Sequence, residues 1–276
     1  MNIEHAKKKV LVIGLDGCRP DALLAADTPN IDRIASNGIY SWNARTEFRT
    51  ISGSAWTSLL TGVHMEKHNV FGNNFRPRDI KYKTLYYYLK EWWSELRIVA
   101  YSHWRPIITK IFEKGIMSKK GSGSDKKVTK KLIKSIKNDN GDLYFIQLDE
   151  IDGAGHKYSY GPDSKRYIEC IEGRDAMVGD IINAVKQRKK EDWLIIVVSD
   201  HGGTGHGHGK PTLDELKIVF IISNDALVEK GEISTDENND EYVEIVDIVP
   251  TIAYFMGYNI RDEWDGVVRG FIQELP

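Results

Sequence analysis

The chain has 276 residues, of which 38 are lysine or arginine and 40 are aspartate or glutamate, for a formal net charge of −2. This length suits one large α/β domain or two small ones, with a substantial buried core. The near-neutral charge excludes a general binder of long nucleic acids, which needs a basic excess. Two cysteines, Cys18 and Cys170, exclude a disulfide scaffold and fit a reducing compartment.

The apolar runs of the sequence are short. The longest uncharged ones, 194–199 and 218–223, fall far below the roughly 18–20 residues that span a bilayer. The basic stretch Lys7–Lys9 is followed by an apolar run that ends at Asp16. This run is too short to be the apolar core of a signal peptide. We therefore expect no membrane span and a cytoplasmic location.

Hydrophobic periodicity predicts strands that alternate with helices. In chain order the predicted elements are a strand at 10–15, helices from Asp21 and at 29–36, a helix at 54–60, a helix at 84–93, a strand at 98–101, a strand at 143–148, a helix at about 164–190, strands at 194–198 and 218–222, and a helix at 247–256. The strands are continuously apolar, which is typical of strands buried on both faces. The pattern predicts an α/β fold with a mostly parallel central sheet and helices on both faces.

The segment 114–137 is strongly basic. It contains nine lysines and a single acid, Asp125, around a stretch 121–124 of glycine and serine that we expect to be flexible. An amphipathic helix is predicted after it from the spacing of Val128, Leu132 and Ile136. The lysines fit a solvated surface beside a mobile loop, or a patch that steers a charged substrate.

Three of the predicted strands are followed directly by carboxylates and imidazoles set among glycines. These candidate ligands are Asp16, Asp152, His156, Asp200, His201, His206 and His208. Ligands of open α/β sheets bind beyond the carboxyl ends of strands, and mixed nitrogen and oxygen donors suit zinc or manganese. Asp16 alone is as well explained as a helix N-cap and His156 alone as a surface histidine, but the three strand ends together favour a metal site.

A second candidate element is the run of hydroxylated residues before the helix predicted at 54–60. A helix N-terminus attracts anions, and a hydroxyl beside a metal is a candidate nucleophile. Thr50, Ser52 and Ser54 are the residues of this kind. The alternative is that Ser52 or Ser54 only caps the helix.

With these motifs, residues 10–223 and 247–251 resemble the alkaline phosphatase superfamily, most closely its type I phosphodiesterase/nucleotide pyrophosphatase branch. The resemblance implies an alkaline-phosphatase-like core formed by one catalytic domain, residues 1–276. Because the chain is short for the family, it also implies a small cap within residues 74–142. The family nucleophile lies nine residues before a Thr-Gly pair, which selects Ser52 and leaves Thr50 and Ser54 out of register.

The family's metal ligands map onto the candidate residues one by one. The resemblance assigns Asp16, Asp200 and His201 to the metal that also contacts Ser52, and it assigns Asp152 and His156 to a second metal. His208 is the best match for the sixth ligand, with His206 as a competitor. Asn73, about twenty residues after the nucleophile, matches an asparagine that donates to a phosphoryl oxygen, although it also fits a turn residue after Gly72.

The chain departs from the family in one place. The branch commonly has a threonine nucleophile followed by Phe-Pro-Asn, whereas this chain has Ser52 followed by Gly53. We find no match for the arginine and third metal of the phosphomonoesterases, and a serine in place of cysteine argues against a sulfatase.

The resemblance implies a hydrolase with two divalent metals, zinc or manganese, that cleaves phosphodiester or pyrophosphate bonds of a small, nucleotide-like substrate. We expect a phosphoseryl intermediate on Ser52, with Asn73 and the N–H after Ser52 stabilising the phosphoryl oxygens. A phosphomonoesterase, phosphonate hydrolase or phosphomutase on the same scaffold is the main alternative. A non-catalytic metal-binding scaffold is a further one, and the oligomeric state stays open.

Overall fold

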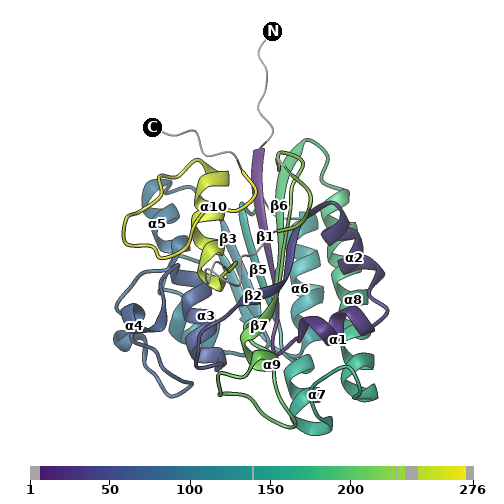
Figure 1. Cartoon of the computed structure of the whole chain (residues 1–276). Helices are drawn as coiled ribbons and strands as arrows, with labels where there is room; N and C mark the ends of the chain where they lie inside the picture. The colour runs from purple at the N-terminus through teal and green to yellow at the C-terminus, as the bar shows by residue number, and fades with distance from the viewer. Residues whose placement is uncertain (1–6, 139, 228, 234–241, 272–276) are drawn as a thin grey trace.

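The computed structural model describes residues 7–138, 140–227, 229–233 and 242–271 (Figure 1). Within these ranges eight strands form one sheet in the order β4-β3-β5-β1-β6-β7-β2-β8. The strands are β1 (Lys7–Leu15), β2 (Gly38–Arg45), β3 (Ile98–Ser102), β4 (Lys119–Ser122), β5 (Leu143–Leu148), β6 (Glu191–Val198), β7 (Lys217–Ser223) and β8 (Gly231–Glu232). The strands β4, β3, β5, β1 and β6 run parallel, whereas β7 is antiparallel to its neighbours β6 and β2. The predicted mostly parallel α/β sheet is confirmed.

Helices cover both faces of the sheet, as predicted. They are α1 (Pro20–Ala25), α2 (Pro29–Ser36), α3 (Ser52–Thr61), α4 (Met65–His68), α5 (Leu85–Trp92), α6 (Asp125–Asn138), α7 (Glu150–Tyr158), α8 (Lys165–Lys186), α9 (Leu213–Leu216) and α10 (Ile248–Met256). Figure 1 shows α3, α5 and α10 on one face and α1, α2, α6 and α8 on the other. Shorter helical turns lie at Pro77–Asp79, Ile107–Ile111 and Ile245–Asp247.

The central strand β1 shows why its sequence is continuously apolar. Val10 and Val12 pack into the core cluster that contains α3, α5 and α10, whereas Leu11 and Ile13 pack into the cluster under α2, α6 and α8. Successive side chains of a strand point to opposite faces, so both sets are buried. Each fully buried side chain of this size contributes roughly 1.5–3 kcal/mol of hydrophobic stabilisation.

Several elements were not predicted from the sequence, among them β2, β4 and α7. β2 was not predicted, because its burial alternates irregularly around a bulge between Ser41 and Ala44. β4 is an edge strand paired with β3, and its residues Gly121 and Ser122 lie where we expected a flexible loop. α7 was not predicted, because Gly153 within it disfavours a helix.

Within residues 74–142, where we expected a small cap, β3 and α6 belong to the central fold. β3 is buried along its whole length between β4 and β5. The helix α6 packs on the sheet through Val128, Leu132 and Ile136, the three residues from which it was predicted. These elements are therefore part of the central fold and not of a cap, because their apolar residues complete its two cores.

None of the helices in the described ranges has the length and apolar character needed to cross a bilayer. Cys18 and Cys170 are both free thiols.

Candidate metal and catalytic site

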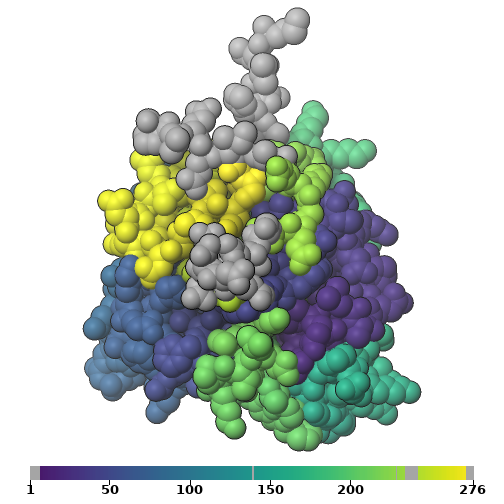
Figure 2. Space-filling view, viewed as in Figure 1, coloured from purple at the N-terminus to yellow at the C-terminus, as the bar shows by residue number. Residues whose placement is uncertain are grey.

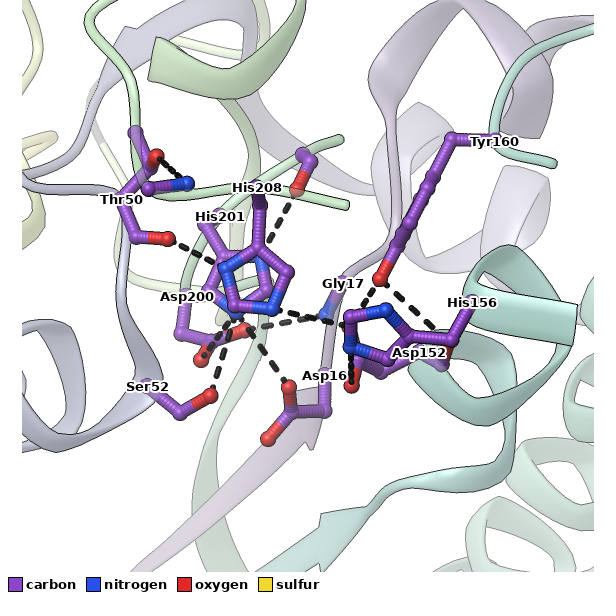
Figure 3. Close-up of polar contacts among 12 residues, drawn as sticks. Asp16, Gly17, Thr50, Ser52, Asp152, His156, Tyr160, Asp200, His201 and His208 are labelled. Carbon is purple, nitrogen blue, oxygen red and sulfur yellow. Dashed lines mark hydrogen bonds and ion pairs between the residues drawn. The ribbon is translucent and has the colours of Figure 1, made fainter. Parts of the chain in front are cut away.

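The carboxyl ends of the neighbouring strands β5, β1 and β6 bring six of the predicted ligands together (Figure 3). They form two groups, within each of which one ligand atom per residue lies within 4.8 Å of the others. The first group is Asp16, Asp200 and His201, and the second group is Asp152, His156 and His208. In the space-filling view the green segment around residues 201–216 lies between the blue segment that contains α3 and the teal segment that contains α7 (Figure 2).

The first group is completely buried. Nε2 of His201 lies 3.6 Å from Oδ1 of Asp16 and 3.4 Å from Oδ2 of Asp200. These two carboxylate oxygens have no hydrogen-bond partner. Because a buried, unpaired carboxylate oxygen is costly, the donor set of this group fits a divalent cation.

The other oxygens of the two aspartates are held by the protein. Oδ2 of Asp16 accepts hydrogen bonds from Nε1 of Trp56 and Nε2 of Gln147, both at 2.8 Å. Oδ1 of Asp200 accepts from the N–H of Gly17 at 3.0 Å. These contacts fix which oxygen of each carboxylate is left free. Sequence reasoning missed both side-chain donors, although an amide in an apolar strand was a signal for Gln147.

The second group is built on α7. Asp152 and His156 are one helical turn apart, and their Oδ2 and Nε2 atoms lie 3.2 Å from each other. Nε2 of His208 lies 3.7 Å from Oδ1 of Asp152. Gly17 has a φ of +65°, and a Cβ atom there would lie 2.6 Å from Oδ1 of Asp152. Glycine at this turn therefore lets α7 approach the end of β1.

Each of the three histidines in these groups uses Nδ1 to bind a backbone carbonyl. The pairs are His201 with the carbonyl of Gly202 at 2.7 Å, His208 with that of Thr50 at 2.5 Å, and His156 with that of His206 at 2.9 Å. A ring that donates through Nδ1 presents Nε2 to the group. This arrangement is the usual one for histidines that bind metals.

His206 takes no part in either group. Its ring is exposed, and its Nδ1 donates to the backbone carbonyl of His156 at 3.1 Å. The structure thus brings His208 to Asp152 and His156, and leaves His206 outside them.

The two groups are neighbours. The rings of His201 and His208 stack with centroids 3.8 Å apart and an angle of 19° between their planes. Burial lowers the pKa of both rings, so they are neutral near pH 7. Neutral imidazole is the form that binds a metal.

Burial and neighbouring charges shift the pKa values of the three aspartates, Asp16, Asp152 and Asp200. Burial, together with Asp200, raises the pKa of Asp16 well above its usual range. Burial and the charge of Asp152 raise the pKa of Asp200 to about 8. Burial acts in the same direction on Asp152, but the hydrogen bond to His156 and the nearby histidines lower its pKa to about 2. A bound cation would favour the ionised form of all three.

Ser52 lies beside the first group. It is the first residue of α3, and the cap position before it is Ile51, so the serine hydroxyl does not cap the helix. Oγ of Ser52 instead lies 3.2 Å from Nε2 of His201. Asp16 is not a helix cap either, because the cap position of α1 is Arg19.

Asn73 contacts the residue after Ser52. Oδ1 of Asn73 accepts a hydrogen bond from the N–H of Gly53 at 2.8 Å. This N–H, which we expected to face a substrate, is therefore already occupied. A Cβ atom at Gly53 would lie 2.4 Å from the carbonyl oxygen of Gly72, so glycine allows the loop to approach α3. The amide nitrogen of Asn73 is left as the donor on this side.

Thr50 has a different role from Ser52. Its hydroxyl donates to Oε2 of the buried Glu215 at 2.8 Å and accepts from the N–H of Gly209 at 2.7 Å. Oε2 of Glu215 also accepts from the N–H of Lys210 at 2.6 Å. These bonds tie the loop that carries His208 to the segment that precedes Ser52. Sequence reasoning did not identify Glu215, which no motif singled out. The buried hydroxyl of Ser54 has no hydrogen-bond partner.

A third cluster of potential ligands, His103, Asp125 and Glu150, has a structural explanation. Asp125 accepts hydrogen bonds from the N–H groups of Asp149 and Glu150 at the start of α7, at 2.9 and 3.1 Å. It also accepts from Nε of Arg174 at 2.9 Å. Its charge and both oxygens are satisfied without a cation.

The aromatic residues that we considered for stacking a base or sugar divide by exposure. Phe75 is buried in the core, and Trp104 is partly buried against the same core cluster. Phe71 and Tyr158 are exposed. Phe71 lies two residues before Asn73, and the guanidinium of Arg49 lies 5.8 Å from the centre of its ring. An exposed cation and an exposed ring therefore flank the Ser52 segment.

Comparison with known proteins places this chain in a family. The profile of the family described as type I phosphodiesterase / nucleotide pyrophosphatase matches residues 10–122 and 117–245. Ectonucleotide pyrophosphatase/phosphodiesterase family member 7 of Mus musculus is 25% identical over 221 residues, which cover 71% of this chain and 50% of the relative. A bis(5′-adenosyl)-triphosphatase of Mus musculus is 23% identical over 96% of this chain and 58% of its own length. The chain spans about half the length of the curated relatives it matches.

Solved structures show the same fold. Human ectonucleotide pyrophosphatase/phosphodiesterase 5 superposes with a TM-score of 0.76 at 15% identity, covering 94% of this chain and 97% of that one. A 2-O GAG sulfatase has a TM-score of 0.76 at 14% identity, covering 98% of this chain and 76% of that one. The family profile accounts for most of the sequence, and the chain belongs to the type I phosphodiesterase/nucleotide pyrophosphatase family.

Proposed function

We propose that this protein is a metal-dependent hydrolase that cleaves phosphodiester or pyrophosphate bonds of small, nucleotide-like molecules with Ser52 as nucleophile. The observation that carries the proposal is the position of the Ser52 hydroxyl beside two adjacent groups of aspartate and histidine. Membership of the family supports the reaction class. The two unpaired carboxylate oxygens of the first group support a cation there.

The two groups would each hold one divalent ion. Asp16, Asp200 and His201 would bind the ion next to Ser52, and Asp152, His156 and His208 would bind the other. Three imidazoles among six ligands favour zinc, and the three carboxylates also suit manganese. When bound, such ions act as Lewis acids on phosphoryl oxygens and lower the pKa of a coordinated hydroxyl.

The chain's own residues would carry the covalent steps. Oγ of Ser52 forms a bond to phosphorus while the bond to the leaving oxygen breaks, and water then hydrolyses the phosphoseryl ester and restores the hydroxyl. Ser52 lies in the first turn of α3, where the helix dipole favours an anionic substrate. The amide nitrogen of Asn73 would donate to a phosphoryl oxygen, a contact worth about 3–4 kcal/mol in comparable sites.

Two comparisons support a nucleotide-like substrate. One similar protein is named a bis(5′-adenosyl)-triphosphatase, and the murine ectonucleotide pyrophosphatase/phosphodiesterase 5, an inactive form, was solved in complex with AMP. In this chain the exposed Phe71 and Arg49 beside the Ser52 segment offer a stacking surface and a cation. A phosphomonoesterase, phosphonate hydrolase or phosphomutase remains the alternative on this scaffold.

Trapping the covalent intermediate tests the proposal. We expect acid quenching during turnover of a nucleotide p-nitrophenyl diester, which releases p-nitrophenol, to leave a nucleotidyl adduct (the mass of the nucleoside monophosphate group) on the peptide that contains Ser52, as seen by mass spectrometry. Ser52→Ala should lose the adduct and at least 1,000-fold in rate, about 4 kcal/mol, whereas Ser54→Ala should retain both. An adduct elsewhere, or full activity in Ser52→Ala, would contradict the assignment. Faster cleavage of the monoester of the same alcohol would favour the alternative.

A further inference from the structure

A basic groove runs along the segment 105–114, outside the candidate catalytic site. It consists of two cavities, of about 650 Å³ and 420 Å³, that share Thr109, Phe112, Glu113 and Lys114 in their walls. These volumes lie in the range of small-molecule sites. The groove accounts for part of the lysine-rich segment, which the proposed hydrolysis does not use.

The walls of the groove are strongly cationic. The basic residues that line it are Arg78, Lys83, Arg105, Lys110, Lys114 and Lys120. Within the part of the chain that the structure describes, none of these six forms an ion pair, and the nearby Asp79 is paired with Arg76. Unneutralised cations around one concave surface create a local positive potential, although the whole chain has a net charge of −2.

The single carboxylate in the groove is already bound. Oε1 of Glu113 accepts a hydrogen bond from the N–H of Thr84 at 2.9 Å, and Oε2 accepts from the hydroxyl of Thr84 at 2.7 Å. Glu113 thereby holds the start of α5. Both of its oxygens accept hydrogen bonds from Thr84, and among the lysines of the groove the charge of Lys83 acts on this carboxylate.

Aromatic rings support two of the cations. Nζ of Lys83 lies 5.1 Å from the ring centre of Tyr87, and Nζ of Lys110 lies 4.9 Å from that of Phe75. Contacts of this type orient an ammonium group without neutralising its charge. The two cations remain able to bind an anion.

The groove is also connected to the candidate catalytic site. Arg105 follows Trp104, whose N–H donates to Oε1 of Gln147 at 2.8 Å. Nε2 of the same Gln147 donates to Asp16 at 2.8 Å. Ser122, at the carboxyl end of β4, lines the larger cavity, so part of the groove lies at the same edge of the sheet as the site.

We propose that the basic groove is a second binding site, which takes a small anion carrying several phosphate groups. Six cations spread over two adjoining cavities match separated negative charges better than a single phosphate, because each phosphate group can contact a different part of the wall. The proposal does not depend on hydrolysis at Ser52.

Calorimetric titration of the full chain with inorganic tripolyphosphate, at 0.15 M salt without added divalent metal, tests this site. We expect saturable binding that the double variant Lys110→Glu, Lys114→Glu weakens at least tenfold. The matched control is Lys130→Glu, Lys134→Glu on the exposed face of α6, which makes the same change in net charge outside the groove and should alter the affinity less than twofold. Equal weakening by both variants, or no binding to the wild type, would overturn the proposal.

A second variant and a second probe keep the test independent of folding. Arg105→Gln removes one cation without reversing its charge, and we expect it to weaken tripolyphosphate binding several-fold with an unchanged melting temperature. Vesicles that contain an anionic lipid are the other probe. Sedimentation with the vesicles in the absence of any tripolyphosphate binding would overturn the proposal in favour of a membrane surface.

Discussion

Oγ of Ser52 lies 3.2 Å from Nε2 of His201, whose ring is completely buried at the end of β6 (Figure 3). Nδ1 of His201 donates to the carbonyl of Gly202, so Nε2 presents its lone pair to Ser52 and to the two free carboxylate oxygens. Because burial lowers the pKa of His201, this lone pair is available at neutral pH. A hydroxyl and two unpaired carboxylate oxygens therefore all lie within 3.6 Å of the Nε2 atom of His201.

Removal of one ligand should remove one metal. We expect His208→Ala to retain about one of two bound zinc ions by elemental analysis and to lose activity by at least 100-fold, about 3 kcal/mol. His206→Ala is the matched control in the same loop, since its ring lies in neither group of ligands. It should keep both ions. The opposite pattern would assign the sixth ligand to His206.

Loss of the Thr50 hydroxyl should weaken metal binding, although Thr50 is in neither group of metal ligands. Thr50→Val keeps the shape of the side chain but removes its bonds to Glu215 and Gly209, which hold the loop of His208. Loss of such an outer contact typically costs 10–100-fold in metal affinity, and we expect that range in a competition titration with a chelator. Thr204→Val, on the exposed part of the same loop, should leave the affinity unchanged. Equal affinities in the two variants would show that the Thr50 bonds do not position His208.

The two sides of the Asn73 amide can be separated. Asn73→Asp keeps an oxygen that accepts from the N–H of Gly53 but lacks the nitrogen donor, so we expect kcat to fall by roughly 100-fold. Asn74→Asp makes the same charge change at the exposed neighbour and should change kcat less than threefold. A drop of similar size in both variants would indicate a general effect of negative charge near the site.

The stability of the protein should depend on pH through His64. The neighbouring carboxylates of Glu244 and Glu47 raise the pKa of this partly buried ring from 6.5 to about 10. A raised pKa stabilises the fold fully below pH 6.5, and the stabilisation is lost as the pH rises through 10. We expect the melting temperature to fall between pH 7 and pH 10, and His64→Gln to reduce this fall by about 2–4 °C, since the ring is one-third exposed.

His206→Gln is the control for this pH effect, because its Nδ1 donates to the backbone carbonyl of His156 and not to Glu47 or Glu244. It should leave the slope of melting temperature against pH unchanged. A His64→Gln variant with the wild-type slope would show that this ring does not carry the pH dependence.

Elements were predicted correctly from the sequence where their apolar residues are the ones that the fold buries. β1 and β5 read as strands because both of their faces are buried, and α6 was predicted from three residues that do pack on the sheet. β4 and α7 escaped prediction because exposed lysines and internal glycines carry no periodic signal. β4 forms because it pairs with β3, and α7 is held by packing against α8.

The site residues that could be predicted are the aspartates and histidines that follow a strand in the sequence. Contacts between residues far apart in the sequence could not be predicted. Asp16 and His201 follow strands directly and stand out among glycines. The contacts of Trp56 and Gln147 with Asp16 join segments 40 and 131 residues apart, and no local pattern announces them. The Gly53 N–H was assigned to a substrate because only the fold shows Asn73 beside it.

The central claim is that two ions bind at the two groups that flank Ser52, and an anomalous difference map of zinc-loaded crystals tests it most directly. The account predicts two peaks about 4 Å apart, one contacted by Asp16, Asp200 and His201 and the other by Asp152, His156 and His208. A single peak in fully loaded crystals, or peaks away from these residues, would contradict it.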